Sequence, residues 1–139
     1  MSKAAVVYYS STGNTEKMAE AVAEAARAKG AETDLVSCES FAGNVEDYDA
    51  VAFGCSAMGN EVLEETVFEP MFAALESKLS GKKVGLFGSY GWGDGQWMRD
   101  WADRCRSDGA VLINDGVIAN NEPDEEALAQ CRALGEELA

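Results

Sequence analysis

The chain has 139 residues, of which 47% are hydrophobic and 26% charged, a composition typical of one ordinary globular domain spanning residues 1–139. Lysine and arginine number 11 against 25 aspartates and glutamates, and the net charge of −14 disfavours nucleic acid and anionic membranes as partners. The chain contains no histidine, so it lacks the side chain that most often acts as a general base or metal ligand.

Short apolar runs alternate with stretches of helical periodicity along the chain. Strands are predicted over residues 3–9, 33–38, 50–55, 83–89 and 111–119, the last bulged around 114–116, and helices over 15–29, 70–79, 96–108 and 124–138. This alternation predicts an α/β fold, a doubly wound five-stranded parallel sheet of order 2-1-3-4-5 with helices on both faces. Ligands of such sheets bind beyond the carboxyl ends of the strands, so the loops 10–15, 56–61, 89–95 and 120–123 are the candidate site.

The cysteines and the N-terminal segment indicate a reducing compartment. Cys38, Cys55, Cys105 and Cys131 form no C-x-x-C pair, so we expect buried free thiols and no metal site. The apolar run at residues 4–9 is too short for a secretion signal or a membrane span. We therefore expect a cytoplasmic protein.

The first candidate loop concentrates hydrogen-bond donors between a strand and a helix. It consists of Ser10, Ser11, Thr12, Gly13, Asn14 and Thr15. Four hydroxyls, an amide and the unpaired amides of the first helical turn all suit a phosphate group. The alternative is a simple helix N-cap, but a cap needs only one hydroxyl. The loop contains no lysine or arginine, which excludes a Walker A motif and leaves a phosphate monoester held by neutral donors.

This loop matches the pattern [ST]-x-T-G-x-T of the flavodoxins, and the chain as a whole resembles a short-chain flavodoxin, without the fifth-strand insertion of the long-chain branch. The resemblance implies a flavodoxin-like fold and non-covalently bound FMN. It also implies a monomeric, low-potential electron carrier that transfers one electron at a time, not an enzyme with its own substrate.

The second loop supplies candidate contacts for a flavin ring, from Ser56, Ala57, Met58, Gly59, Asn60 and Glu61. The resemblance implies that Ser56 adds a hydroxyl to the phosphate site. It further implies that Met58 lies against the inner ring face and that Glu61 accepts from the ring N3–H. Without the resemblance, the favoured interpretation of Met58 is a gap-filling core residue, and that of Glu61 is a solvated loop charge.

Gly59 and Asn60 form a dipeptide that can reorient at low cost, because both residues tolerate the left-handed conformation. The resemblance implies that one orientation presents the Gly59 carbonyl to the flavin N5–H and so stabilises the neutral semiquinone. Asn60 departs from the aspartate or glycine common in the family, and the departure removes one charge.

The third loop is rich in glycine and exposes aromatic side chains. It contributes Ser89, Tyr90, Gly91, Trp92 and Gly93, and we expect the two aromatic residues to stand out of the loop instead of joining the core. The resemblance implies that Trp92 covers the outer ring face. Gln96 replaces the third glycine of a dinucleotide fingerprint, which excludes that motif. Trp97 and Trp101 lie at helical spacing and are assigned to the core.

Asn121, in the last loop, is the remaining candidate, for the ribityl chain or the phosphate. The acidic surface suits transient docking to the basic faces of redox enzymes, although acidity also serves solubility.

Two other functions stay open. An FMN-dependent NAD(P)H/quinone reductase could use the same phosphate loop, although Trp92 would block its outer ring face. A phosphate-receiver domain would need acidic residues where Tyr8 and Tyr9 stand, and a small phosphatase would need a cysteine and an arginine in the first loop.

Overall fold

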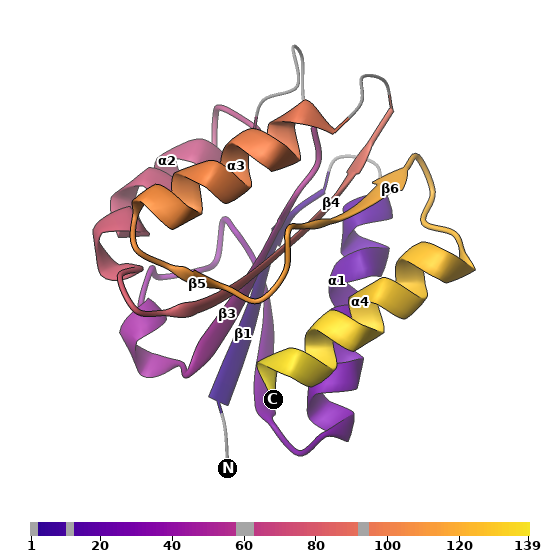
Figure 1. The fold of residues 1–139 in the computed structure, drawn as a ribbon, viewed down its shortest axis with the longest axis horizontal. Helices are drawn as coiled ribbons and strands as arrows, with labels where there is room; N and C mark the ends of the chain where they lie inside the picture. Colours follow the sequence, from indigo (N-terminus) through magenta and orange to yellow (C-terminus); the bar gives the residue numbers. More distant parts are fainter. Residues whose placement is uncertain (1–2, 11–12, 58–62, 92–94) are drawn as a thin grey trace.

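The structure is a computed structural model that describes residues 3–10, 13–57, 63–91 and 95–139 (Figure 1). Its elements in chain order are β1 (Lys3–Tyr9), α1 (Asn14–Ala28), β2 (Glu32–Ser37), the 3₁₀ turn η1 (Val45–Asp47), β3 (Ala50–Cys55), α2 (Phe68–Leu75), the 3₁₀ turn η2 (Glu76–Lys78), β4 (Lys83–Tyr90), α3 (Gln96–Ser107), β5 (Val111–Leu112), β6 (Val117–Asn120) and α4 (Glu125–Leu138).

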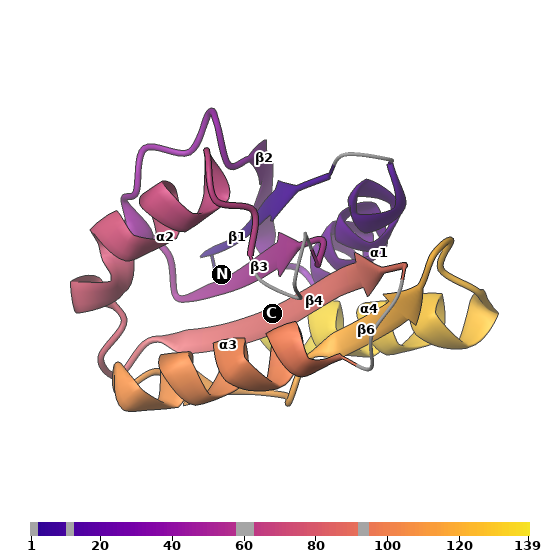
Figure 2. The same cartoon turned by 90° about the horizontal axis from the view of Figure 1, so that it is seen from above.

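The strands form one parallel sheet in the order β2-β1-β3-β4-β5, and β6 also pairs with β4. The predicted order 2-1-3-4-5 is therefore confirmed. β3 and β4 run side by side through the middle of the sheet (Figure 2). All six residues of β3 are buried, as expected of a strand covered on both faces. Because every strand runs in the same direction, the loops that follow β1, β3, β4 and β6 lie along one edge.

Two apolar clusters lie on opposite faces of the sheet, and β1 contributes to both. Ala5 and Val7 pack in the cluster beneath α2 and α3, whereas Ala4 and Val6 pack in the cluster beneath α1 and α4. This alternation follows from the two-residue period of a strand. Helices therefore cover both faces of the sheet, as the sequence predicts (Figure 1).

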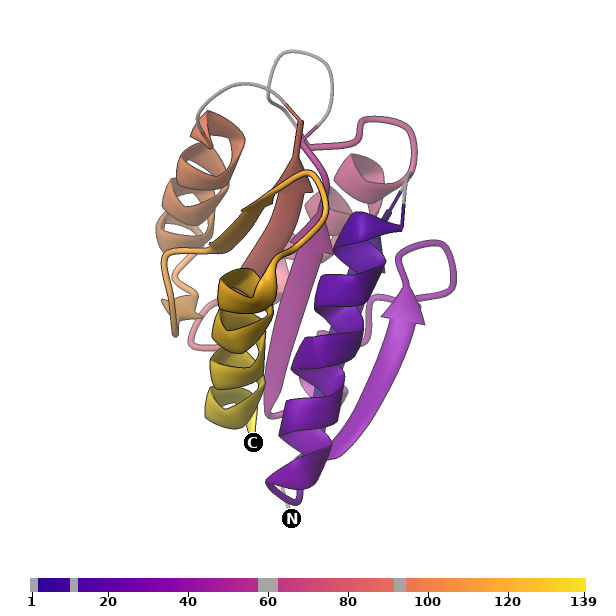
Figure 3. The same cartoon turned by 90° about the vertical axis from the view of Figure 1, so that its right-hand side faces the viewer.

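The two faces are packed with side chains of different size. Aromatic residues dominate the α2–α3 side, where the rings of Phe68 and Phe72 each lie nearly perpendicular to the Trp101 indole, with centroids 5.4 and 5.8 Å away. On the other face, α1 and α4 lie side by side in front of the sheet (Figure 3). A Cβ at Gly135 would lie 2.2 Å from the Val22 carbonyl oxygen, so only glycine permits this close helix contact.

The last strand differs from the prediction. One bulged strand was expected over residues 111–119, but the structure divides it into β5 and β6, so the sheet has a sixth strand. Asn114 bridges the gap with its side chain: its Oδ1 accepts from the Leu86 amide and its Nδ2 donates to the Leu86 carbonyl, both at 3.1 Å. A side-chain amide thus replaces a backbone peptide in the ladder. The sequence motif marked the irregularity but not this substitution.

An ionic cluster joins the two helices of the aromatic face. Arg104 of α3 binds Glu69 of α2 and Glu76 of η2, each with a closest contact of 2.6 Å. The hydrogen bond to Arg104 lowers the pKa of Glu76. Asp108, at the end of α3, lies beside Glu76. Burial of the Asp108 carboxyl, followed by the hydrogen bond and negative charge of Glu76, raises its pKa to about 6.

We expect Asp108→Asn to stabilise the protein at pH 7. In the unfolded chain an aspartate has a pKa of ~3.9, which is below the pKa of Asp108 in the folded protein. The folded protein therefore binds the Asp108 proton more tightly than the unfolded chain does. The stability from that proton is fully present below about pH 4 and is lost as the pH rises through about 6. The variant avoids this loss and should gain about 1 kcal/mol at pH 7, a value discounted for solvent screening of a partly exposed carboxyl.

Urea unfolding at pH 7 and pH 4 measures the effect, and Asp103→Asn on the exposed side of the same helix is the control. A gain of equal size at both pH values would contradict the assignment.

Candidate functional site

The segments that follow β3, β4 and β6 are joined to one another at the carboxyl edge of the sheet. The Ala57 amide, just after β3, donates to the Ser89 carbonyl of β4 at 3.0 Å, and the Asn121 amide, just after β6, donates to the Tyr90 carbonyl at 2.7 Å. The loops predicted to form the site therefore lie together, and their described ends are tied by backbone hydrogen bonds.

Helix α1 begins at this edge without a side-chain cap. Its N-cap is Gly13, which has a φ of +93° and whose amide donates to Ser10 Oγ at 3.0 Å. Glycine adopts this left-handed conformation without strain. By contrast, Asp124 caps α4 by accepting from the Ala127 amide at 2.9 Å. Within the part of the chain that the structure describes, no side chain caps this helix start, so the amides that begin α1 at Asn14 can bind an acceptor from outside the helix, and the positive end of the helix dipole favours an anion.

A buried network of hydroxyl groups connects three of the loops. Thr15 Oγ1 lies 2.8 Å from Ser56 Oγ and accepts from the Ser89 amide at 3.2 Å. All three residues are buried, and Thr15 is completely so. The Ser89 amide must donate, so Thr15 Oγ1 keeps one proton and one lone pair for its contact with Ser56. Thr15 therefore positions Ser56 beside the start of α1.

The last loop is fixed through Asn121. Its φ of +58° is the single positive value among the non-glycine residues that the structure describes. Ser89 Oγ donates to the Asn121 carbonyl at 2.7 Å, so this hydroxyl holds the loop. The Asn121 side chain is exposed, and its Oδ1 lies 3.4 Å from where a Cβ on Gly91 would stand. A Cβ at Gly91 would therefore make only ordinary van der Waals contact with the asparagine.

Tyr90 does not stand free of the core as expected. It is the last residue of β4, it is half-buried, and its ring packs at 5.4 Å from the Trp97 ring. Trp97 in turn donates from Nε1 to the Cys55 carbonyl at 3.2 Å. The predicted core positions of Trp97 and Trp101 are confirmed, since both are at most 2% exposed. The tyrosine joins them because β4 extends one residue beyond the predicted end.

Part of the predicted site lies outside the described residues: Ser11, Thr12, Met58, Gly59, Asn60, Glu61, Trp92 and Gly93. The described members, which are Ser10, Gly13, Asn14, Thr15, Ser56, Ala57, Ser89, Tyr90, Gly91 and Asn121, all lie at the carboxyl edge of the sheet.

The sequence prediction missed Glu64, which is 5% exposed and caps α2. Its Oε1 accepts from the amides of Val67 and Phe68 at 2.7 and 2.9 Å, and its Oε2 accepts from the amide and hydroxyl of Thr66. Burial raises the pKa of the Glu64 carboxyl, but these donors lower it by a larger amount, so that the pKa is about 2. The signal was the acidic residue before the helix, and it was missed because the helix was predicted to begin only at Pro70.

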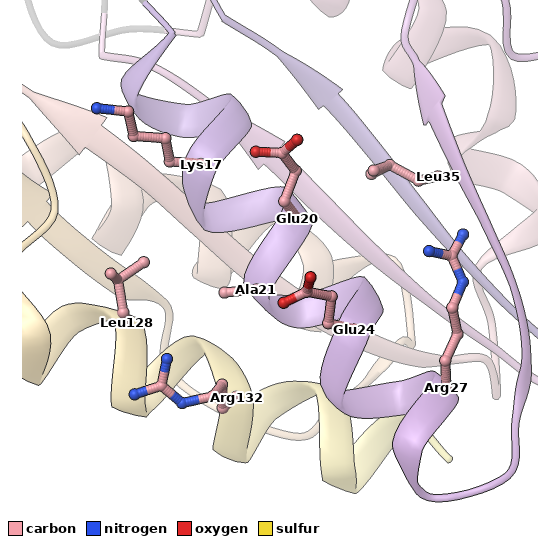
Figure 4. A pocket seen from close by; sticks show the side chains of 8 residues that line it. All are labelled: Lys17, Glu20, Ala21, Glu24, Arg27, Leu35, Leu128 and Arg132. Carbon is pink, nitrogen blue, oxygen red and sulfur yellow. The ribbon is translucent and has the colours of Figure 1, made fainter.

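One cavity lies beside this hydrogen-bonded edge, and another lies away from it. A cavity of about 220 Å³ adjoins Ser10 and Gly13 and is bordered by Tyr8, Tyr9 and Cys38. Another of about 440 Å³ runs along α1 toward α4 and β2, lined by basic, acidic and apolar side chains (Figure 4). Figure 4 shows Arg27 and Arg132 at this second cavity on separate elements, and none of its lining residues belongs to the predicted site.

The fold and the donor set define a class of protein: a doubly wound α/β domain whose described hydrogen-bond donors gather at the switch point between β1 and β3. The flavodoxin family model matches residues 6–135. The flavodoxin of Clostridium beijerinckii is 46% identical over 96% of this chain and 97% of its own, and that of Megasphaera elsdenii is 47% identical over 96% of both. The structure of the two-electron reduced Megasphaera elsdenii flavodoxin superimposes with a TM-score of 0.86 and covers 96% of each chain.

This chain belongs to the flavodoxin family, whose members carry electrons on a flavin and do not convert a substrate of their own. The length and coverage of the matches place it with the short-chain flavodoxins. The resemblance read from the first loop is thus confirmed, and the relatives give the reductase alternative no support.

The described residues fit the phosphorylated end of a flavin. An uncapped helix N-terminus, Ser10 and the positioned Ser56 offer neutral donors at one point. Neutral donors match a phosphate monoester, because a metal-bridged polyphosphate would require a cationic side chain in the loop.

We expect Thr15→Val to weaken binding of FMN more than binding of riboflavin. Valine keeps the shape of threonine but leaves the Ser89 amide without its acceptor, at a cost of about 2 kcal/mol in the free energy of unfolding. Ser56 also loses its partner beside the phosphate position, so FMN affinity should fall about tenfold, which is ~1.4 kcal/mol.

Flavin fluorescence titration measures both affinities. Thr33→Val is the matched control, because Thr33 is also buried and its hydroxyl bonds Ala31 at 3.2 Å, away from the site. Equal losses of FMN and riboflavin affinity would show that Thr15 has no specific role at the phosphate.

Proposed function

We propose that this protein carries one electron at a time between redox enzymes on non-covalently bound FMN. The observation that carries the proposal is the uncapped start of α1 beside Ser10 and Ser56, with no lysine or arginine in the loop 10–15. Such a site suits one phosphate group and supports FMN over a dinucleotide flavin. Gln96, at the position of the third glycine of a dinucleotide fingerprint, supports the same choice.

The ring contacts in this proposal come from the family resemblance. Met58 and Trp92 would cover the two ring faces, Glu61 would accept from N3–H, and the Gly59 carbonyl would accept at N5 in one redox state. Bound FMN supplies reversible one-electron chemistry. The chain's own residues orient the ring, exclude water from its faces and hold the proton at N5.

The negative charge of the protein lowers the reduction potential at which the flavin takes up its second electron. The net charge of −14 opposes an added negative charge on the ring, although exposed carboxylates are screened over about 8 Å at physiological salt. Glu64 is different, because its carboxylate is buried, stays ionised above about pH 2 and lies three residues after the end of the loop 56–61. A buried charge is screened much less, so it contributes more than a distant surface carboxylate.

The acidic surface supports transient, salt-sensitive docking to redox enzymes with basic faces, by a monomeric carrier. All four cysteines are free and buried, which fits our proposal of a cytoplasmic location. Among the described residues, no helix is both long and apolar enough to cross a membrane.

We expect the purified protein to bind FMN and to take up two electrons in separate one-electron steps. The physical reason is that a proton held at N5 favours the first electron, whereas the acidic protein opposes the second. Stepwise reduction followed by visible absorption measures both potentials, and the half-reduced sample should absorb at long wavelength. A single two-electron wave, or a protein that takes up no FMN, would contradict the proposal; steady NAD(P)H oxidation by the pure protein would favour the reductase alternative.

We expect Trp92→Ala to weaken FMN binding about tenfold and to change the potential of the second step. Stacking of an aromatic side chain on a flat heterocycle is worth ~1–3 kcal/mol, and its removal also lets water reach the ring. Trp92→Phe keeps a flat face and should retain most of the affinity. If the alanine variant keeps both affinity and potentials, Trp92 is not part of the site.

A further inference from the structure

We propose that Tyr8 is a positioning residue that holds the Glu16 carboxylate away from the amides at the start of α1, and so keeps that helix terminus open for the cofactor phosphate. The inference rests on the proposed function, because it takes the phosphate of FMN to bind at the start of α1. Tyr8 and Glu16 together then set how strongly the protein prefers FMN to riboflavin, which has no phosphate.

Glu16 occupies the position in α1 from which a carboxylate commonly closes a helix start. The N-cap is Gly13, so Glu16 is the third residue of the helix. In a capping box, the carboxylate at this third position accepts from the backbone amide of the N-cap. Here the Gly13 amide donates instead to Ser10 Oγ, at 3.0 Å. The Glu16 carboxylate therefore lies away from the place that its position in the helix favours.

The carboxylate is held by Tyr8 of β1, whose Oη donates to Glu16 Oε2 at 3.0 Å. The Tyr8 backbone is paired on both sides, with Ser37 of β2 and Gly54 of β3. Its half-buried ring packs against the apolar cluster beneath α1 and α4. Burial, followed by the hydrogen bond and the charge of Glu16, raises the pKa of the Tyr8 hydroxyl, so the hydroxyl keeps its proton and donates at neutral pH. A fixed donor on the sheet thus binds a carboxylate on the helix.

Open space connects the Glu16 carboxylate with the segment that precedes α1. The cavity of about 220 Å³ beside the site is bordered by, among others, Tyr8, Ser10, Gly13 and Glu16. Glu16 is exposed, and no ion pair among the described residues includes it. Without the hydroxyl of Tyr8, this unneutralised carboxylate has room to turn toward the helix start.

The position of this carboxylate matters because a carboxylate and a phosphate bind the same groups. The amides and the positive end of the dipole at a helix start favour any anion, so an unrestrained Glu16 competes with the phosphate. In addition, repulsion between two like charges ~4 Å apart weakens binding about fivefold even in water. The hydrogen bond from Tyr8 removes both effects. Riboflavin is subject to neither, so only binding of the phosphorylated cofactor depends on Tyr8.

The test compares two tyrosines that each donate to a carboxylate. Tyr8→Phe removes the hydroxyl that binds Glu16. The matched control is Tyr48→Phe, which removes the hydroxyl that donates to Asp34 Oδ2 of β2 at 2.7 Å, away from the predicted site. Fluorescence titration of the flavin-free chain measures both affinities. Tyr8→Phe should lower FMN affinity about fivefold and leave riboflavin affinity within about twofold of wild type, whereas Tyr48→Phe should change neither.

Removal of the charge tests whether the effect passes through Glu16. In a Glu16→Gln background, Tyr8→Phe should no longer lower FMN affinity, because the released side chain is neutral. Glu16→Asp is a second, independent variant: its carboxylate is one methylene shorter, so it loses the Tyr8 hydroxyl and stays beside the start of α1. It should lower FMN affinity in the same direction, and it tests the inference even if Tyr8→Phe does not fold.

A readout without flavin separates positioning from a loss of packing. In the flavin-free chain, the amides of Asn14 and Thr15 should exchange with solvent more slowly in Tyr8→Phe than in wild type, because the released carboxylate accepts from them. The double variant Tyr8→Phe/Glu16→Gln should exchange at the wild-type rate. A loss of packing would instead speed exchange in both variants.

FMN affinity of Tyr8→Phe, or of Glu16→Asp where it replaces it, that equals that of wild type would overturn the inference while leaving the proposed function intact. An equal loss for FMN and riboflavin, or a loss that persists in the Glu16→Gln background, would overturn it as well. A wild-type chain that binds no FMN would overturn the proposed function and the inference together.

Discussion

The arrangement of the site depends on one buried hydroxyl group, that of Thr15. It contacts Ser56, 41 residues further along the chain, and accepts from the amide of Ser89, which is 74 residues away. Buried polar groups are costly when unpaired, so each of these residues stabilises the position of the others. The start of α1, the end of β3 and the end of β4 are thereby held at one point. Ser56 keeps its position beside the start of α1 because this network holds it.

The proposed site for an anionic group lies in a protein that is itself strongly negative. The loop 10–15 has no cationic side chain, and two described cations outside it are paired with carboxylates. Lys17 lies 3.4 Å from Glu122 at the surface, and Arg104 binds two glutamates between α2 and α3. Recognition therefore relies on hydrogen-bond geometry and on the dipole of α1 instead of on net charge. Binding of this kind is sensitive to small displacements of the donors, which explains why so many contacts fix the loop ends.

The two faces of the sheet have different tasks. On one face, α1 and α4 approach closely where Gly135 lies against Val22 and Ala25. On the other face, large aromatic rings support the ends of β3 and β4, with Trp97 reaching both the Cys55 carbonyl and the Tyr90 ring. Glu64 links this aromatic face to the flavin loop by capping α2. The cofactor loops are thus supported from both sides of the sheet by helices that pack in different ways.

The sequence by itself predicted the order of the strands and the family, because these predictions rest on local patterns: apolar runs of strand length, helical periodicity and the contiguous run of Ser10 to Thr15. It marked the irregular last strand through residues 114–116, but only the tertiary structure showed that Asn114 completes the ladder at Leu86. The partners of Thr15, the cap formed by Glu64 and the packing of Tyr90 on Trp97 were likewise decided in three dimensions. Each of these contacts is set by how neighbouring strands and helices are brought together, and such pairings leave no periodic signal in the chain.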